Sequence, residues 1–126
     1  MSTFKDKTGA EVEVIRDDAL GAFAIKDVAT GQTMGRTFYV DVENGGATDR
    51  IYFHTEVPEA FGGRGLATIL VEQALRQTNA AGLTTVALCP MVRGYLSKHP
   101  DAGIAVRTPT TSDITAVNHY IEQASH

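Results

Sequence analysis

Cysteine, tryptophan and long apolar runs are scarce or missing in this sequence. Cys89 is the one cysteine, so the chain cannot close a disulfide on itself, which fits a reducing compartment. No apolar run approaches the roughly 18 residues that a membrane-spanning helix needs. Residues 1–7 lack the apolar core of a signal peptide. We therefore expect a cytoplasmic protein with no membrane partner.

Basic runs, repeats and linkers are also absent. The formal net charge is -4 without a lysine or arginine cluster, which makes nucleic acid a poor candidate partner. We expect no metal site, because no close pairing of the zinc-ligand type occurs among His54, Cys89, His99, His119 and His126. With 126 residues and no linker, the chain is expected to form one domain, residues 1–126.

The first half of the chain has the patterns of β-strands. Such runs cover residues 11–14, 22–25 and 37–42, and Asn44-Gly45-Gly46 is typical of a turn. Residues 51–57 alternate most regularly, and Pro58 should end this strand because it lacks a backbone N–H. The period of two predicts one face with Ile51, Phe53, Thr55 and Val57 and the other with Tyr52, His54 and Glu56.

The second half changes to helical spacing. An apolar face recurs from Leu66 to Ala74, polar residues up to Asn79 lie opposite it, and Gly82 suits the left-handed position just past a helix end. Residues 84–88 are typical of a buried strand, 91–98 of a short helix and 104–106 of a last strand. Ser112 is predicted to cap a final helix in a C-terminal extension, residues 108–126. This order predicts an α/β fold, with a mixed α+β arrangement around a mixed sheet.

A glycine-rich segment, Phe61 to Ala67, stands between the most regular strand and the first long helix. Backbone N–H groups at a helix start lack internal partners, and glycines let a phosphate approach them closely. A triphosphate loop would need Gly-Lys-Ser/Thr where Gly65-Leu66-Ala67 stands, and a dinucleotide loop would need glycine in place of Thr68. Two interpretations remain: a cradle for a pyrophosphate, or a tight turn that only caps the helix.

Further short motifs flank this loop. They are His54-Thr55-Glu56-Val57-Pro58, Gly63-Arg64-Gly65-Leu66-Ala67, Cys89-Pro90 with Tyr95, and His99-Pro100. In this order they resemble the short GNAT-like acetyltransferases, a minimal branch of the GNAT superfamily, over residues 37–100. The resemblance implies a GNAT-like central mixed, mostly antiparallel sheet with splayed strands flanked by helices. It also implies acetyl-CoA as the co-substrate.

The resemblance assigns residues to that cofactor. The superfamily pattern (Gln or Arg, two residues, Gly, one residue, Gly or Ala) falls on Gly62, Gly65 and Ala67. Gly62 departs from it, since it lacks a long polar side chain, and Arg64 is a candidate for a charge-assisted phosphate contact instead. The implied cofactor residues are Thr55 and Val57 on the splayed strand 51–57, opposite strand 85–89, and Gly62, Gly63, Arg64, Gly65, Leu66 and Ala67 in the loop.

Four side chains are candidates for the transfer chemistry. His54 or Glu56 could take the proton of an attacking amine, and an imidazole titrates nearer neutrality than a carboxylate, which favours His54. The family often places an acidic tyrosine where Tyr95 stands, so Tyr95 could protonate the leaving thiol. Cys89 could do the same or accept the acetyl group covalently. Structural roles compete with each: a solvated sheet face for His54 and Glu56, packing for Tyr95, and a small buried residue for Cys89.

The predicted function is acyl-CoA-dependent N-acetyl transfer to an amine of a small molecule or a protein. Two other functions stay open. One is a CoA-binding or acyl-CoA-sensing module without catalysis, which the departure at Gly62 allows. The other is an interaction protein that uses an apolar stripe on the last helix, formed by Ile114, Val117, Tyr120 and Ile121.

Overall fold

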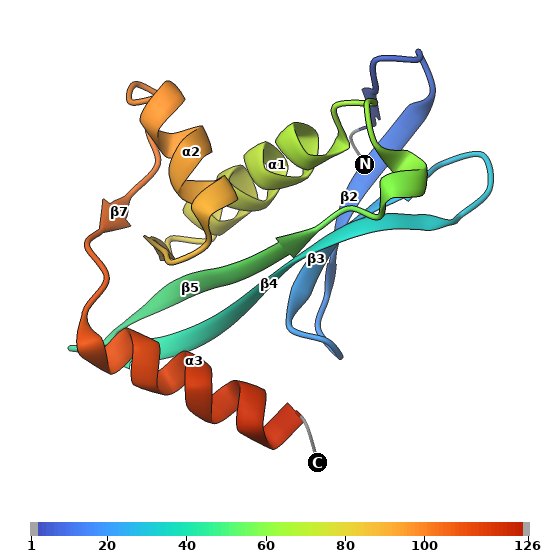
Figure 1. Ribbon diagram of the computed structural model, residues 1–126. Coiled ribbons are helices and arrows are strands. Elements are labelled where there is room, and N and C mark those ends of the chain that lie inside the picture. The colour runs from blue at the N-terminus through green and yellow to red at the C-terminus, as the bar shows by residue number, and fades with distance from the viewer. Residues whose placement is uncertain (1–2, 125–126) are drawn as a thin grey trace.

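The computed structural model describes residues 3–124, and a curled seven-stranded sheet organises them (Figure 1). The strands lie side by side in chain order. Neighbours from β1 to β5 are antiparallel, whereas β5–β6 and β6–β7 are parallel. Their bounds are β1 Phe4–Lys5, β2 Glu11–Asp17, β3 Ala22–Asp27, β4 Thr33–Asn44, β5 Ala47–Glu56, β6 Thr84–Ala87 and β7 Val106–Arg107.

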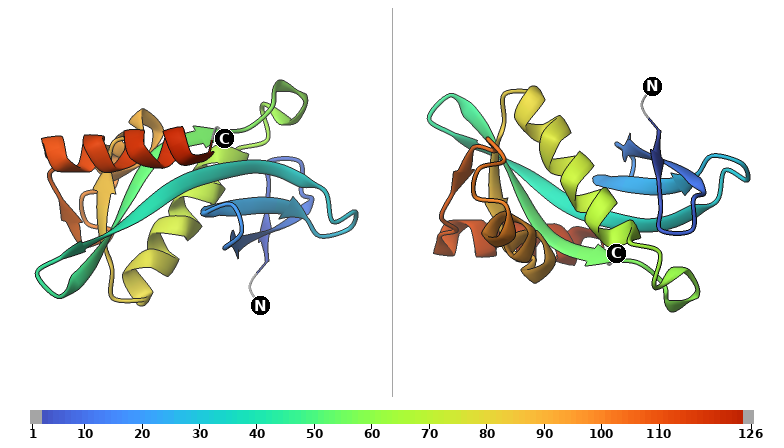
Figure 2. Two further views of the ribbon diagram at one scale, coloured as in Figure 1. Left: turned by 90° about the horizontal axis from the view of Figure 1, so that it is seen from below. Right: turned by 90° about the horizontal axis from the view of Figure 1, so that it is seen from above.

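Helices cover both faces of the sheet. The short 3-10 helix η1 (Glu59–Phe61) follows β5 and precedes α1 (Leu66–Ala80). Helices α1 and α2 (Pro90–Lys98) lie on one face, and α3 (Thr111–Ala124) lies across β4 and β5 on the opposite face (Figures 1 and 2). The mixed, mostly antiparallel sheet flanked by helices is the fold that the sequence predicted.

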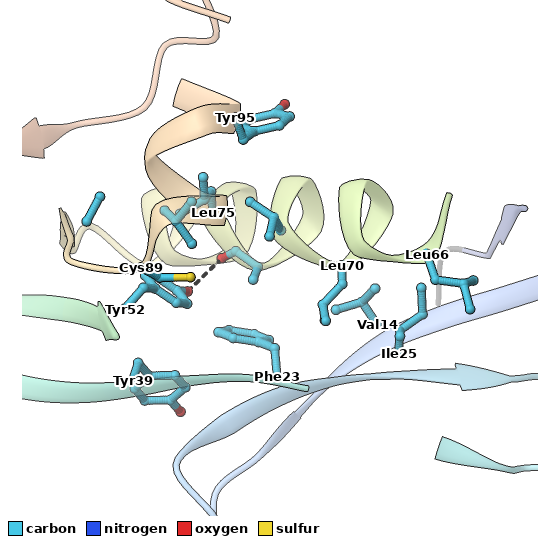
Figure 3. Close-up of a cluster of buried hydrophobic side chains, with 14 of the residues drawn as sticks. Val14, Phe23, Ile25, Tyr39, Tyr52, Leu66, Leu70, Leu75, Cys89 and Tyr95 are labelled. Carbon is cyan, nitrogen blue, oxygen red and sulfur yellow. Dashed lines mark hydrogen bonds between the residues drawn. The ribbon is translucent and has the colours of Figure 1, made fainter. Parts of the chain in front are cut away.

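The main core lies between α1 and the sheet (Figure 3). Leu66, Leu70 and Leu75 of α1 are almost fully buried against Phe23 and Ile25 of β3. A second, smaller cluster lies under α3 and contains Ile51, Val86 and Val117. Because both faces of β5 and β6 are covered, the short apolar run of β6 needs no polar alternation.

A β-bulge in β5 changes the face on which the later side chains lie. Phe38 pairs with His54 and Tyr39 pairs with Tyr52, so Phe53 stands opposite no residue of β4. An extra residue of this kind shifts the alternation by one position. The predicted faces were therefore wrong: Tyr52, Thr55 and Val57 lie on the α1 face, while Ile51, Phe53, His54 and Glu56 lie on the α3 face.

Smaller differences from the sequence prediction concern element ends. The structure adds β1, starts β4 at Thr33, and places β7 at 106–107 instead of 104–106. Helix α3 begins one residue before Ser112, so the predicted Ser112 cap was wrong. The backbone N–H and hydroxyl of Thr110 both donate to the Asp113 carboxylate, at 2.7 and 3.1 Å. These two hydrogen bonds fix the N-terminus of the helix.

Candidate functional site

Strands β5 and β6 part in the middle of the sheet. Their pairing ends at Tyr52 and Ala87, after which β5 continues to Glu56 while the other chain segment turns into α2 at Pro90. The N–H groups of Leu88 and Cys89 both donate to the Tyr52 carbonyl at 2.9 Å. These two N–H groups are thus occupied at the fork, and donors for a developing oxyanion would have to come from β5 beyond Tyr52.

The glycine loop leads from the end of β5 to the first turn of α1. Gly63 and Gly65 have positive φ values of 77° and 74°, a conformation that favours glycine. Ile69 N–H closes the first turn onto the Gly65 carbonyl at 3.3 Å. The N–H groups of residues 66–68 precede that bond and have no helical partner, so they form the positive end of the α1 dipole. Free N–H groups in this arrangement are suited to an anion.

Arg64 holds the loop to the N-terminal hairpin. Its Nε donates to Asp6 Oδ2 at 2.6 Å, and Asp27 lies 3.9 Å from its Nη2. Hydrogen bonds from Thr8 and then from Arg64 keep the pKa of the Asp6 carboxyl well below its usual range. The Arg64 guanidinium is therefore already paired, and a phosphate contact would have to share it with Asp6.

Lys7 is a candidate that the sequence analysis missed. Its backbone N–H donates to the Arg64 carbonyl at 3.0 Å. A Cβ added to Gly65 would lie 3.2 Å from Lys7 Cε, so the aliphatic part of this exposed lysine lies across the loop. The fold thereby brings a cation to the start of α1. The position of Lys7 follows from the contact between this hairpin and a loop almost sixty residues away. No local sequence pattern could have predicted it.

A groove of about 400 Å³ runs between α1 and α2 from this loop. Ala67, Thr68 and Val71 of α1 line one side, and Met91, Gly94, Tyr95, Lys98 and His99 line the other. A Cβ at Gly94 would meet nothing within 4 Å, so the absence of a side chain there leaves the groove open. Lys98 adds a second cation on its rim. The groove therefore extends the anion cradle along the α1 side of the sheet.

Tyr95 lies in this groove and connects the two helices. Its hydroxyl donates to Glu72 Oε1 at 3.0 Å, and its ring packs on His99 with 4.4 Å between centroids. Figure 3 shows the hydroxyl pointing away from the Cys89 sulfur. Burial, and next the hydrogen bond to Glu72, raise the pKa of Tyr95. A role as acid would require this hydroxyl to leave Glu72 and turn to the thiol.

Cys89 lies at the fork itself and is 3% exposed. Its thiol donates to the Thr55 hydroxyl at 3.3 Å, and Thr55 Oγ1 lies 2.8 Å from Thr37 Oγ1. Among the described residues, the thiol has no hydrogen bond to a histidine or carboxylate. The three groups form a short polar chain where β5 and β6 separate, and it includes no base that would generate a thiolate.

His54 and Glu56 lie together on the opposite face of the sheet, under α3. His54 Nε2 is 3.4 Å from Glu56 Oε2, and the side chains are 55% and 54% exposed. The imidazole stacks on Phe38 with 5.9 Å between ring centroids and 25° between planes. Both side chains line a groove against α3. The structure thus brings the two predicted proton acceptors together but separates them from Cys89 and Tyr95 by the thickness of the sheet.

Comparison with known protein families fits this geometry. A family model described as GCN5-related N-acetyl-transferase matches residues 22–104, which is more than half of the chain. The chain belongs to this GCN5-related N-acetyltransferase family. The match contains β3 to α2, hence the fork, the glycine loop and the groove, and it ends before α3.

Two solved structures resemble the chain at low sequence identity, and the first of them shares its fold. A GCN5-like protein from Staphylococcus aureus, solved by NMR, is 19% identical with a TM-score of 0.55, and the match covers 79% of this chain and 91% of that one. An aminoglycoside acetyltransferase from an uncultured soil metagenomic sample is 15% identical with a TM-score of 0.43. That match covers 86% of this chain and 60% of the other. No curated protein sequence matches the chain.

Two kinds of feature are absent from residues 3–124. Within this part of the chain, no helix is both long and apolar enough to cross a membrane. Nor do three His, Cys, Asp or Glu side chains of these residues come together as ligands for one metal ion.

Proposed function

We propose that this protein transfers the acetyl group of acetyl-CoA to a primary amine. The observation that carries the proposal is the fork between β5 and β6, together with a groove between α1 and α2 and a second groove on the opposite side of the sheet, against α3. The α1–α2 groove begins at an anion cradle on one face, and the groove with His54 lies on the other. Reactants bound in the two grooves would meet where the strands part, and a transferase needs such an arrangement.

The chain's residues fit the pyrophosphate and amide-bearing arm of CoA. Residues 63–68 would bind the pyrophosphate through backbone N–H groups, with Lys7 and Lys98 as nearby cations. The arm would pass between Thr55 and Val57 on β5 and the chain around Cys89, where β5 has lost its pairing with β6. This position brings a thioester to the Thr37–Thr55–Cys89 chain of polar groups.

The chemistry of the step needs one base. A primary amine has an ordinary pKa of about 10.4 and arrives as an ammonium ion, so it must lose a proton to become a nucleophile. His54 takes that proton, the amine nitrogen bonds to the thioester carbonyl carbon, and the carbon–sulfur bond breaks. CoA leaves as a thiolate, which takes up the second proton that the amine nitrogen loses, and the product is a neutral acetamide. Glu56, 3.4 Å from His54, stabilises the protonated imidazole.

We assign Cys89 to packing and polar contact at the fork rather than to a covalent acetyl intermediate. Its thiol donates to Thr55, and no described base lies within hydrogen-bond distance to remove the proton. Direct transfer from acetyl-CoA to the amine needs only the base on the other face. A non-catalytic CoA-binding module is the second candidate function, because Gly62 lacks the usual polar side chain and Arg64 is bound to Asp6.

Binding of acetyl-CoA tests the proposal at its first step. We expect millimolar acetyl-CoA to raise the melting temperature, because ligand at a hundred times its Kd adds about 2.7 kcal/mol to the free energy of unfolding. Thiol release should then follow when primary amines are added. A higher melting temperature without thiol release for any amine would support the non-catalytic CoA-binding module. An unchanged melting temperature would contradict both functions that involve CoA.

Lys7→Ala is expected to weaken acetyl-CoA about tenfold, which corresponds to about 1.4 kcal/mol for loss of a charge-assisted phosphate contact. The physical reason is that Lys7 lies across Gly65 at the start of α1. Isothermal titration would measure the Kd. Lys5→Ala is the matched control, since Lys5 is an exposed lysine of the same hairpin. Equal affinities for the two variants would show that Lys7 makes no contact with the cofactor.

A further inference from the structure

The groove under α3 has an aromatic lining. Its volume is about 490 Å³, within the range of small-molecule sites. Phe38 and Phe53 of the sheet and Tyr120 of α3 supply its rings, and Leu20 from the β2–β3 turn adds an aliphatic side chain. Phe53 and Tyr120 meet edge to face with centroids 5.9 Å apart. These rings offer flat apolar surface and electron-rich faces to a bound molecule.

Negative charge in this groove comes from Glu56. Its carboxylate is half exposed, and its one ion-pair partner among residues 3–124 is His54, at 3.4 Å. Arg36 stands opposite Glu56 in the β4–β5 register, yet this arginine makes no ion pair within 4.0 Å in the described part of the chain. A cationic ligand group beside His54 would therefore meet a carboxylate that forms no ion pair with a lysine or arginine of residues 3–124.

Helix α3 is held in place as a wall of this groove. The Tyr120 hydroxyl donates to the Leu20 carbonyl at 3.0 Å, which ties the helix to the β2–β3 turn. At its other end, Arg107 binds Asp113 of α3 and Asp49 of β5. The family match ends at residue 104, so α3 lies outside the part of the chain that this match contains. The match therefore does not account for this wall of the groove.

We infer that this groove is the acceptor site and that it binds a small primary amine with an apolar, preferably aromatic, body. The ammonium group lies beside the Glu56–His54 pair, and the apolar body packs on Phe38, Phe53 and Tyr120. The role as acceptor site rests on the proposed acetyl transfer, whereas binding of the amine can be measured without acetyl-CoA. A polyamine would leave the rings uncovered, and an amino sugar would place hydroxyl groups against them without hydrogen-bond partners.

The test is a titration of the isotope-labelled full chain followed by NMR, without acetyl-CoA. We expect 2-phenylethylamine to cause saturable shifts confined to β4, β5, α3 and the β2–β3 turn. The isosteric alcohol 2-phenylethanol should bind at least tenfold more weakly, and so should spermidine, glucosamine and a short lysine peptide. Shifts in the α1–α2 groove alone, no saturation, equal affinity for the alcohol, or tighter binding of any other amine would overturn the assignment.

Variants separate the charge from the rings. Glu56→Gln should reduce the affinity for 2-phenylethylamine about tenfold and leave that for 2-phenylethanol unchanged. Tyr120→Ala should weaken both ligands, whereas His119→Gln, which changes an exposed side chain of the same helix outside the groove lining, should bind as the parent does. Unchanged amine affinity in Glu56→Gln would overturn the role of the charge. Failure of the acetyl-CoA titration instead would leave these binding results intact, so the two proposals fail separately.

Discussion

Replacing His54 by glutamine is expected to lower kcat for acetyl transfer by about 10²–10⁴-fold, the range that a positioned general base contributes. Glutamine fills a similar volume beside Phe38 but cannot accept and hold the ammonium proton at neutral pH. The KM for acetyl-CoA should stay within about twofold, because His54 lies on the face of the sheet opposite the α1–α2 groove. Initial rates of thiol release over a range of amine concentrations would measure both parameters.

Two further variants make this result specific. His119→Gln removes an exposed histidine of α3 and should keep full activity. Cys89→Ala should retain turnover if the acetyl group moves directly to the amine, although loss of the contact with Thr55 will lower stability somewhat. A normal rate for His54→Gln, or complete loss of turnover for Cys89→Ala with acetyl-CoA still bound, would contradict the direct mechanism.

The α1 side of the molecule was largely accessible from sequence. Its elements are local: a strand, a glycine loop and a helix follow one another from Ile51 to Ala80, and the helical period of α1 survives in the structure. Positive φ at Gly63 and Gly65 is a property that the residue type itself indicates. The order of short motifs then led to the acetyltransferase family, and the fold followed with it.

The α3 side was less accessible, because long-range pairing decides it. The bulge at Phe53 depends on how β4 and β5 align, and it placed Thr55 and Val57 on the face opposite Ile51 and Phe53, with which they were predicted to lie. His54 and Glu56 nevertheless remained together, since both follow the bulge. The positions of Lys7 over Gly65 and of Tyr120 against Phe53 likewise join segments far apart in the chain. No sequence period carries such information.

The attachment of α3 depends on one arginine. Arg107 Nε donates to Asp49 at 2.6 Å, and its two Nη atoms donate to the two oxygens of Asp113 at 2.8 Å. The Asp49 and Asp113 side chains are only 5% and 3% exposed. Removing the cation would leave two buried carboxylates, and the loss of a partner from such a group is strongly destabilising.

We therefore expect Arg107→Ala to lower the free energy of unfolding by about 3 kcal/mol, near the low end for a broken buried pair, because Asn44 and Thr110 still donate to the carboxylates. Urea denaturation would measure it. Arg16→Ala, which removes an arginine from an exposed pair with Asp18, should cost less than about 1 kcal/mol. Similar losses in the two variants would contradict the role of Arg107.

The ion pairs of Arg107 with Asp49 and Asp113 also make the free energy of unfolding depend on pH in a defined direction. Arg107 first, and then Thr110, lower the pKa of Asp113 from 3.8 to about 2. The unfolded chain therefore binds more protons than the folded one between these values, and stability falls as the pH is lowered from about 4 to 2. Arg107→Ala removes the main cause of the shift, so its unfolding free energy should change less over this window. The difference between parent and variant should shrink as Asp113 is protonated, and a constant difference from pH 5 to pH 2 would show that packing, not charge, holds α3.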